Sequence, residues 1–241
     1  MKWRDVDLFA GTGSATAASP NRFRVEMDER FEAELHADVL DLDPRDLPGP
    51  FRSIWASPPC TAFSVGSFRH HFMATTPCRN CGEVVFRGGY EVWRHDAEPL
   101  PCDNPRPSQV TYAPKSETGR TGLALLQHTL DIIEFWQPRY WIIENPRALM
   151  RKMPELANVE RRTITYCQYG DPRRMKPTDL FGIFPPGFEA RACRNGDPCH
   201  EAAPRGAKTG TQGLSSKEAA MLPPLLSQEL FAAMEAQHEV A

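Results

Sequence analysis

Short apolar runs alternate with amphipathic segments along the chain, and this alternation predicts an α/β fold. Over 121–137, leucines and isoleucines recur at helical spacing until Pro138, which ends the predicted helix. A second helical pattern covers 215–237, with Ser215 or Ser216 as its candidate N-cap. Strands are expected over 5–15, where the run leads into a glycine turn, and over 22–29, 53–59, 139–145, 161–167 and 179–184.

Polar or glycine-rich residues follow four of these predicted strands, at the point where each strand ends. They occupy 9–13, 26–28, 58–60 and 144–145. Strands that alternate with helices form a largely parallel sheet, and the ligands of such sheets bind at the carboxyl ends of the strands. The sequence therefore predicts that these four groups share one edge of the sheet and carry the chemistry.

Between 65 and 118 no hydrophobic period is sustained, which indicates an inserted irregular module. The module contains Cys78 and Cys81, whose two-residue separation is typical of half a zinc knuckle, and His95 and Cys102 follow downstream. A metal bound by these four residues would explain how a segment without a core of its own folds. The alternative is a flexible loop with free thiols.

Composition and charge narrow the function only slightly. The 241 residues carry a formal net charge of −3, so the chain as a whole is not a basic nucleic-acid binder, although 161–177 places five Arg or Lys beside one Asp. No apolar run reaches the length of a membrane span, and the N-terminal segment does not fit a signal peptide. A cytoplasmic, reducing location is expected, where clustered cysteines favour metal ligation or catalysis over disulfides.

The segment 185–214 is expected to be irregular as well. Cys193, Cys199 and His200 offer only three local ligands for a second metal. The glycine- and lysine-bearing end of the segment suits contacts with phosphates instead.

The glycine turn and the acids after it are candidates for binding a nucleotide-like cofactor. Gly11 and Gly13 would let the backbone approach a ligand closely, although such turns also occur without one. Glu26 or Asp28 is placed to hold ribose hydroxyls, and either acid could equally be a solvated turn residue. Asp38 could accept a hydrogen bond from an adenine amino group, or it could cap a helix.

Cys60 and Glu144 are the candidate catalytic pair. A cysteine on a turn after a strand has the partial exposure and the nearby amides that favour a nucleophilic thiolate, whereas most cysteines are buried and inert. Glu144 follows an apolar run, and burial would raise its pKa so that it holds a proton near neutral pH. It could instead be a structural carboxylate that accepts hydrogen bonds from turn amides.

In chain order, the segments DLFAGTG, VEMD, SPPCTAFS, IIENP and YGDPRRMKP resemble the motif series of DNA cytosine-C5 methyltransferases, and the small phage-type orphan members are the nearest match. The resemblance spans 3–64 and 120–184. It implies a Rossmann-like S-adenosylmethionine-dependent methyltransferase fold with a mostly parallel sheet. The implied parts are a catalytic core formed by 1–64 and 119–184, the irregular insertion 65–118, a very small target-recognition segment 185–214, and a C-terminal helical segment 215–241 that completes the core.

The resemblance also implies roles for single residues. S-adenosylmethionine would lie over the glycine turn, with Glu26 on its ribose and Asp38 at its adenine, and Met27 stands where the family often has an aromatic residue. Cys60 would attack C6 of a flipped cytosine in double-stranded DNA, while Glu144 would hydrogen-bond N3 and the exocyclic amine, so that C5 accepts the methyl group. The implied cofactor-binding residues are Phe9, Ala10, Gly11, Thr12, Gly13, Glu26, Met27, Asp38 and Pro58, and the implied catalytic residues are Cys60, Glu144, Pro59, Asn145, Arg173 and Arg174.

The basic motif departs from the family pattern. The family carries a glutamine and alternating arginines after a Y-G-x-P turn, whereas this chain has Arg173, Arg174, Met175 and Lys176 after Pro172. The sequence therefore leaves open which basic side chain approaches the cytosine or a phosphate. The short recognition segment indicates a short or relaxed target, and a monomer is expected, in the host cytoplasm if the chain is phage-encoded. Further candidate DNA contacts, or ordinary surface residues, are Arg69, His70, His71, Arg79 and Arg87.

Other classes of protein compete with this interpretation. An amino (N4) methyltransferase uses a similar SPP turn but places a stacking aromatic residue where Cys60 stands. A zinc-bearing nucleic-acid-binding protein could keep the fold with an inactive site, and the pair of Cys60 and Glu144 argues against it. An RNA substrate, or a modified S-adenosylmethionine as donor, would leave the motifs unchanged.

Overall fold

The computed structural model describes residues 4–87, 93–95, 101–102, 105–202 and 214–237. The chain divides into two compact units. The sheet unit contains Met1–Cys60, Ala124–Arg147 and Val159–Ala241, and the inserted unit contains Thr61–Leu123 and Ala148–Asn158. The inserted unit therefore contains the whole of 65–118, the stretch that lacks a hydrophobic period, and also takes in 148–158.

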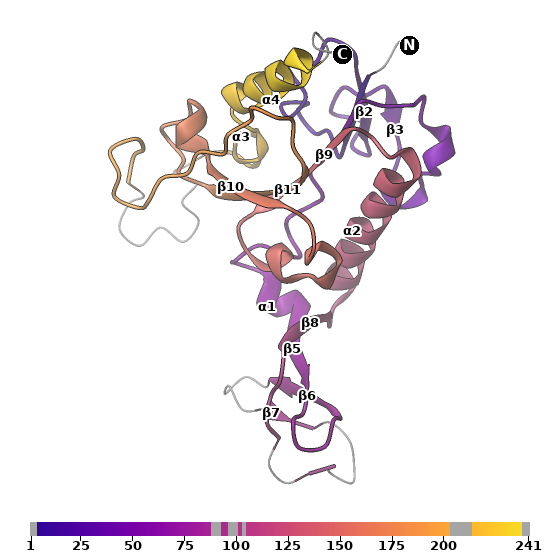
Figure 1. The fold of residues 1–241 in the computed structure, drawn as a ribbon, viewed down its shortest axis with the longest axis vertical. Coiled ribbons are helices and arrows are strands. Elements are labelled where there is room, and N and C mark those ends of the chain that lie inside the picture. The colour runs from indigo at the N-terminus through magenta and orange to yellow at the C-terminus, as the bar shows by residue number, and fades with distance from the viewer. Residues whose placement is uncertain (1–3, 88–92, 96–100, 103–104, 203–213, 238–241) are drawn as a thin grey trace. The chain divides into compact units, whose positions relative to one another are not determined.

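The sheet unit is built on one seven-stranded sheet. Its strands are β1 (Asp5–Leu8), β2 (Arg22–Glu26), β3 (Leu35–His36), β4 (Ser53–Ala56), β9 (Tyr140–Pro146), β10 (Arg161–Thr165) and β11 (Pro177–Ile183), in the order β10-β11-β9-β4-β1-β2-β3 (Figure 1). β3, β2, β1, β4 and β9 run parallel, whereas β11 is antiparallel to both of its neighbours. The predicted α/β fold with a mostly parallel sheet is confirmed.

The register places the predicted chemistry at one edge of this sheet. Leu8 at the end of β1 pairs with Ala56 at the end of β4, and Ala56 pairs with Ile143 of β9. Every residue of β1 and β4 is buried, as is typical of the central strands of a parallel sheet. The residues that follow the paired positions, 9–13, 57–60 and 144–145, therefore emerge at the carboxyl ends of three adjacent strands.

Helices from the C-terminal part of the chain cover the sheet. α4 (Pro224–Ala236) buries Leu226 and Leu230 in the same apolar cluster as Leu180 of β11. The preceding α3 (Ser216–Ala220) begins with Ser215 as N-cap, which forms a capping box with Glu218. The remaining helices of the sheet unit are η1 (Val39–Asp41), η2 (Pro44–Asp46), η5 (Tyr166–Tyr169) and most of α2 (Glu117–Trp136), which ends just before Pro138 as predicted.

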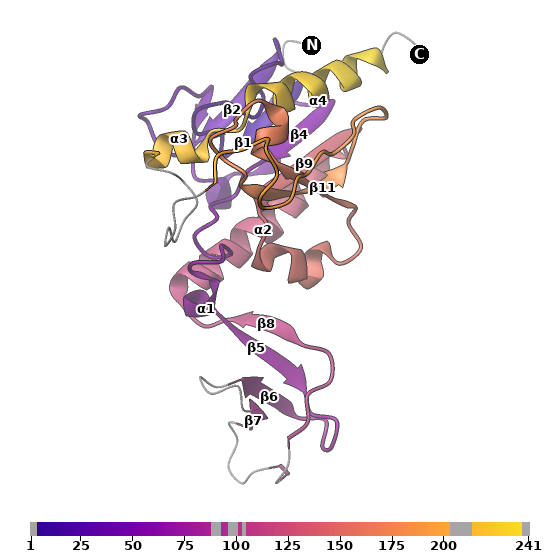
Figure 2. The ribbon, with the colours of Figure 1, turned by 90° about the vertical axis from the view of Figure 1, so that its left-hand side faces the viewer.

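The inserted unit has more regular structure than its sequence indicates. Its strands form a separate four-stranded sheet with the order β7-β6-β5-β8, in which each neighbouring pair is antiparallel. β5 and β8 lie side by side in Figure 2. These strands are too short for an alternating pattern to stand out between the prolines. The elements are α1 (Phe68–His71), β5 (Phe72–Pro77), β6 (Val84–Arg87), β7 (Trp93–Arg94), β8 (Thr111–Pro114), η3 (Leu149–Lys152) and η4 (Pro154–Leu156).

Among the described residues of both units, none of the helices combines the length and the hydrophobicity that a membrane span requires.

Candidate active site and metal cluster

The turn after β1 is shaped by residues with positive φ and fixed by a carboxylate from β2. Phe9, Gly11 and Gly13 have φ of 63°, 51° and 67°. The amide of Gly11 donates to Glu26 Oε2 at 2.7 Å, and the amide of Asp28 donates to Glu26 Oε1 at 2.9 Å. A Cβ at Gly11 would meet no atom within 4 Å, so open space lies directly over this turn. The turn is thus both rigid and accessible to a ligand.

The other predicted cofactor residues surround this turn in sequence and differ in exposure. Ala10 is buried and Thr12 is half-buried, whereas Met27 is 65% exposed. Asp38 caps η1, since its Oδ1 accepts a hydrogen bond from the amide of Leu40 at 3.0 Å. The cap is one of the two roles that the sequence left open for Asp38, and its contact with adenine stays a prediction.

Cys60 lies on the turn that follows β4 and is exposed. Packing around the thiol raises its pKa above the usual 9.0; the charge of Lys176 lowers it, and that of Glu144 raises it. The preceding Pro58 is buried, and its carbonyl accepts a hydrogen bond from Asn145 Nδ2 at 3.0 Å. Asn145 therefore ties the turn of the cysteine to β9, while Pro59 is exposed beside the thiol.

Glu144 lies on β9, the strand next to β4, and its side chain is buried. Burial raises its pKa above the usual value, against the charge of Lys176 and hydrogen bonds with Ser57 and Tyr166, which lower it. Oε1 of Glu144 has no hydrogen-bond partner among the described residues. A buried carboxyl group with one unpartnered oxygen can hold a proton and offer it to a ligand.

The charge of Lys176 acts on both Cys60 and Glu144, and sequence reasoning did not single this lysine out from its basic neighbours. Its Nζ donates to Tyr166 Oη at 3.2 Å and to the carbonyl of Ala219 at 3.0 Å, and lies 4.7 Å from the centre of the Tyr166 ring. Burial lowers the pKa of Lys176, but Tyr166, Glu144 and Cys60 together outweigh it and raise the pKa. The ammonium group is therefore held charged beside both candidate catalytic groups.

Arg173 and Arg174, the two predicted catalytic arginines, differ in burial and in their contacts. Arg174 is buried; its Nε donates to Asp171 Oδ2 at 2.6 Å, and its guanidinium also donates to the carbonyls of Glu218 at 2.8 Å and Met221 at 3.1 Å. Arg174 thus holds the end of α3, and its catalytic role stays a prediction. The side chain of Arg173 is 54% exposed and its Nε lies 3.8 Å from Asp171 Oδ1, so its contact with DNA stays a prediction as well.

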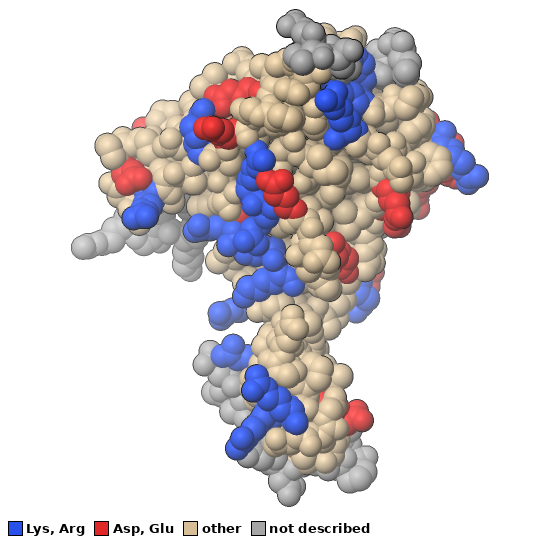
Figure 3. Space-filling view, in the orientation of Figure 1, with Lys and Arg blue, Asp and Glu red and all other residues tan. Residues whose placement is uncertain are grey.

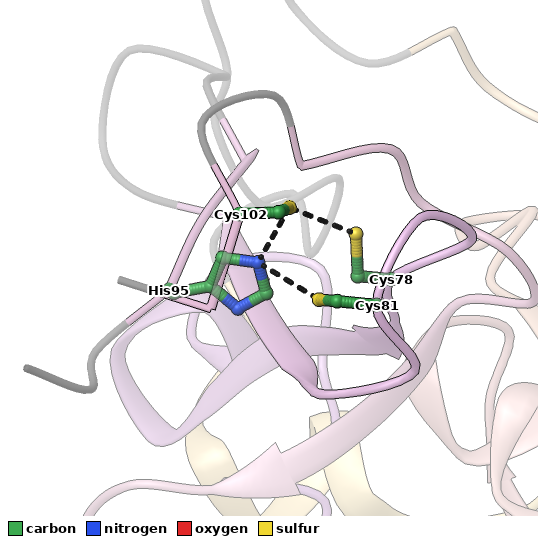
Figure 4. Close-up of side chains that lie close together, drawn as sticks. All are labelled: Cys78, Cys81, His95 and Cys102. Carbon is green, nitrogen blue, oxygen red and sulfur yellow. Dashed lines mark hydrogen bonds between the residues drawn. The ribbon is translucent and has the colours of Figure 1, made fainter. Parts of the chain in front are cut away.

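The four predicted metal ligands of the inserted unit come together (Figure 4). One donor atom from each of Cys78, Cys81, His95 and Cys102 lies within 4.8 Å of all the others. Cys78 Sγ is 3.8 Å from Cys102 Sγ, and His95 Nε2 is 3.4 Å from Cys81 Sγ and 3.3 Å from Cys102 Sγ. This arrangement can hold a tetrahedral metal ion.

Contacts around this cluster orient its ligands. His95 Nδ1 lies 3.2 Å from the carbonyl of Val84, which accepts when Nδ1 carries the proton and so leaves Nε2 directed at the sulfurs. The amide of Arg106 donates to Cys78 Sγ at 3.4 Å, and Gly82, with φ of 81°, closes the turn that carries Cys78 and Cys81. Such outer contacts are typical of metal-binding cysteine turns.

The chain is similar in sequence to a viral protein that is named as a DNA cytosine methyltransferase. No family model matches the chain. It is 26% identical over 245 residues to "Probable DNA (cytosine-5)-methyltransferase" of Frog virus 3 (isolate Goorha), an alignment that covers 95% of this chain and 98% of that protein.

Three solved structures are similar at lower identity. A DNA modification methyltransferase encoded within an E. coli prophage has a TM-score of 0.42 at 14% identity, covering 75% of this chain and 46% of that one. The Entamoeba histolytica methyltransferase EhMeth has a TM-score of 0.45 at 11% identity, covering 80% and 57%. A mutant of Spodoptera frugiperda DNMT2 has a TM-score of 0.41 at 12% identity, covering 83% and 57%. The chain spans about half the length of these three proteins.

The chain has a mostly parallel sheet whose first turn is held by a carboxylate, and over nearly its whole length it is similar to the viral protein. Among S-adenosylmethionine-dependent methyltransferases, it resembles the DNA cytosine-C5 methyltransferases. The resemblance carried by the short motifs is confirmed, because the viral relative extends it over nearly the whole chain.

Proposed function

We propose that this chain is a DNA (cytosine-5-)-methyltransferase, which transfers a methyl group from S-adenosylmethionine to C5 of cytosine through a transient bond from Cys60 Sγ to C6. The proposal rests on the pairing of β4 with β9, which brings Cys60 and Glu144 to the carboxyl ends of adjacent strands, and on the charge of Lys176, which acts on both groups. Nucleophilic addition to a pyrimidine ring needs a thiolate, a group that protonates the ring, and a charge that stabilises the thiolate. These three side chains supply one of each.

The chain's own residues fit the cofactor. S-adenosylmethionine supplies an electrophilic methyl group when bound. The open space over Gly11 leaves room for a ligand against the backbone, and both oxygens of Glu26 are already fixed by amides, so that they can accept from ribose hydroxyls without rearrangement. Met27, exposed beside Glu26, offers a thioether for contact with adenine in place of the family's aromatic ring.

The proposed reaction uses Cys60 and Glu144 in succession. The Cys60 thiolate adds to C6 and breaks the C5–C6 double bond, while Glu144 donates its proton toward N3, so that electron density is delivered to C5. After C5 has taken the methyl group, its proton leaves to water, the C5–C6 double bond forms again as the C6–sulfur bond breaks, N3 returns its proton to Glu144, and the Cys60 thiolate leaves. Lys176 favours the thiolate at the start and at the end of this cycle.

DNA is the proposed substrate, with the target cytosine flipped out of the duplex, because C5 and C6 cannot be reached within stacked base pairs. The inserted unit would contribute contacts to phosphates. Arg79, Arg87, Arg94 and Arg106 are exposed on it, and Figure 3 shows basic side chains gathered on this unit. We also propose that Cys78, Cys81, His95 and Cys102 bind zinc, which stabilises the short strands and turns that carry these arginines.

A mechanism-based trap tests the reaction. DNA that contains 5-fluorocytosine cannot lose a proton from C5, so wild-type protein with S-adenosylmethionine should accumulate a covalent complex that withstands denaturing electrophoresis. Cys60→Ala should form none, and mass spectrometry should find the adduct on Cys60. Transfer of labelled methyl to ordinary DNA, analysed as 5-methylcytosine, completes the test.

Each alternative class gives its own outcome in the same assays. Methyl transfer that yields N4-methylcytosine and persists in Cys60→Ala would make the protein an amino methyltransferase. Binding of DNA without transfer would make it a binding protein with an inactive site. Transfer to RNA in preference to DNA would change the substrate and leave the role of Cys60 intact.

A further inference from the structure

A second cluster of metal-binding side chains lies in the sheet unit. One donor atom from each of Cys167, Cys193, Cys199 and His200 lies within 4.8 Å of all the others. Cys167 Sγ is 3.3 Å from Cys193 Sγ and 3.7 Å from Cys199 Sγ. His200 Nδ1 is 3.6 Å from Cys193 Sγ and 3.5 Å from Cys199 Sγ.

These separations are those of a tetrahedral zinc site. Zinc bonds of about 2.3 Å to sulfur and about 2.0–2.1 Å to nitrogen place the ligand atoms of a tetrahedron roughly 3.5–3.8 Å apart. The three sulfurs are free thiols, and even the shortest sulfur–sulfur separation far exceeds the roughly 2.05 Å of a disulfide bond. Hydrogen bonds between thiols are weak, so they give no comparable reason for four such side chains to converge.

The backbone brings these four residues together before any ion binds. Cys167 lies in η5, directly after β10. The amide of Cys193 donates to Thr165 Oγ1 at 3.0 Å, which fastens Cys193 beside the end of β10. The amide of Arg194 then donates to Asp197 Oδ2 at 2.7 Å in a turn that returns the chain toward Cys193.

We infer that Cys167, Cys193, Cys199 and His200 bind a structural zinc ion that fastens 193–200 to the turn carrying Tyr166. Over 185–202 the structure has no helix or strand, so the hydrogen bonds of regular secondary structure do not hold this segment. The bound ion would hold it instead. Tyr166 precedes Cys167 and hydrogen-bonds Glu144 and Lys176. The ion would therefore anchor the proposed recognition segment to the turn that supports the active site, although the metal site itself does not depend on the proposed function.

Metal content of the purified full-length protein tests the inference. Cys167→Ser, Cys199→Ser and His200→Ala should each contain one zinc ion per chain fewer than wild type, and His200→Cys should retain it because thiolate replaces imidazole. Cys60→Ser, which changes a thiol outside the cluster, should match wild type. Unchanged zinc content in Cys167→Ser and Cys199→Ser would overturn the inference, as would a disulfide between Cys167 and Cys193 in the purified chain.

Proteolysis supplies a second measurement that keeps all four ligands of the second cluster in place. Cys81→Ser removes a ligand of the other cluster and leaves the second cluster intact. In this variant, a zinc chelator should increase the rate of tryptic cleavage after Arg194 at least several-fold, and added Zn²⁺ should restore protection. A cleavage rate that is the same with and without chelator would contradict a metal that orders 193–200. Both measurements are independent of methyl transfer, so they separate this inference from the proposed reaction.

Discussion

Asp7 gives a quantitative test of the electrostatics in the sheet unit. Its side chain on β1 is fully buried; Thr16 Oγ1 donates to Oδ2 at 2.7 Å, and Oδ1 has no partner among the described residues. Burial raises the pKa of Asp7 from 3.8 to about 7, against the Thr16 hydrogen bond and the charges of Arg22 and Arg24, which lower it. Asp7 is therefore an acid that the fold keeps protonated below about pH 7.

The burial of Asp7 makes the free energy of unfolding decrease as the pH rises. Because the pKa of Asp7 is higher in the folded chain, the folded state retains a proton that the unfolded state releases between pH 3.8 and about 7. Stability is lost as the pH rises through that interval, and the full cost applies above it. At about 1.36 kcal/mol per pH unit, the interval corresponds to roughly 4 kcal/mol of unfolding free energy.

Asp7→Asn removes the titration and keeps the size of the side chain. The difference in unfolding free energy between variant and wild type should grow in favour of the variant by about 1.36 kcal/mol per pH unit from pH 5 to 7 and level off above pH 7. Urea unfolding followed by tryptophan fluorescence at pH 5, 6, 7 and 8 measures this difference. Any fixed cost of burying the Asn amide shifts all four values equally and leaves the slope unchanged.

Asp5, two residues earlier on the same strand, is the matched control. Its buried carboxylate accepts hydrogen bonds from Arg52 at 2.7 and 3.0 Å and from Ser19 and Ser53. Asp5→Asn should destabilise the protein by about 3 kcal/mol, because the buried guanidinium of Arg52 loses the more deeply buried of its two carboxylate partners, Asp5 and Glu235. A stability difference for Asp7→Asn that is equal at pH 5 and pH 8 would refute the assignment of a neutral, high-pKa Asp7.

Four further outcomes are expected. Lys176→Met should raise the pKa of Cys60, slow adduct formation with 5-fluorocytosine DNA at pH 7 by about tenfold or more, and move the rising limb of its pH profile upward, whereas Lys176→Arg should retain most of the rate. Glu144→Gln, which cannot supply the proton, should lower the single-turnover rate of methyl transfer by about 10²–10⁴-fold while the protein still binds the cofactor in calorimetry. Gly11→Val should weaken S-adenosylmethionine binding in calorimetry, because its side chain fills the open space and strains a turn at positive φ. Cys81→Ser should lower zinc content by one ion and make the inserted unit more sensitive to proteases.

The features that depend on local sequence were predictable. Buried strands such as β4 and β9 appear as short apolar runs, and their carboxyl ends fix where Cys60 and Glu144 emerge. The end of α2 follows from Pro138, and the spacing of Cys78 and Cys81 indicated the metal cluster of the inserted unit. In each case a few neighbouring residues determine the outcome.

The features that depend on the path of a loop were not predictable. Three basic residues share the stretch 173–176. Lys176 donates to Tyr166 and Arg174 donates to Asp171, and no pattern of neighbouring residues distinguishes these two paths. Cys167 lies at the end of a predicted strand, far along the chain from Cys193, so spacing gave no sign of a fourth ligand. A count of cysteines did hold a hint, because three remained after the active site and the first cluster.

The carbonyl of Ala219 accepts hydrogen bonds from both Lys176 and Arg174. The cation beside Cys60 is thus braced by a helix that lies beyond 203–213 in the chain. If the chain were severed within that interval, Lys176 and Cys60 would remain on one fragment, and the helix whose carbonyl holds the ammonium group would be on the other. Fragment complementation would then make methyl transfer a reporter of whatever brings the fragments together.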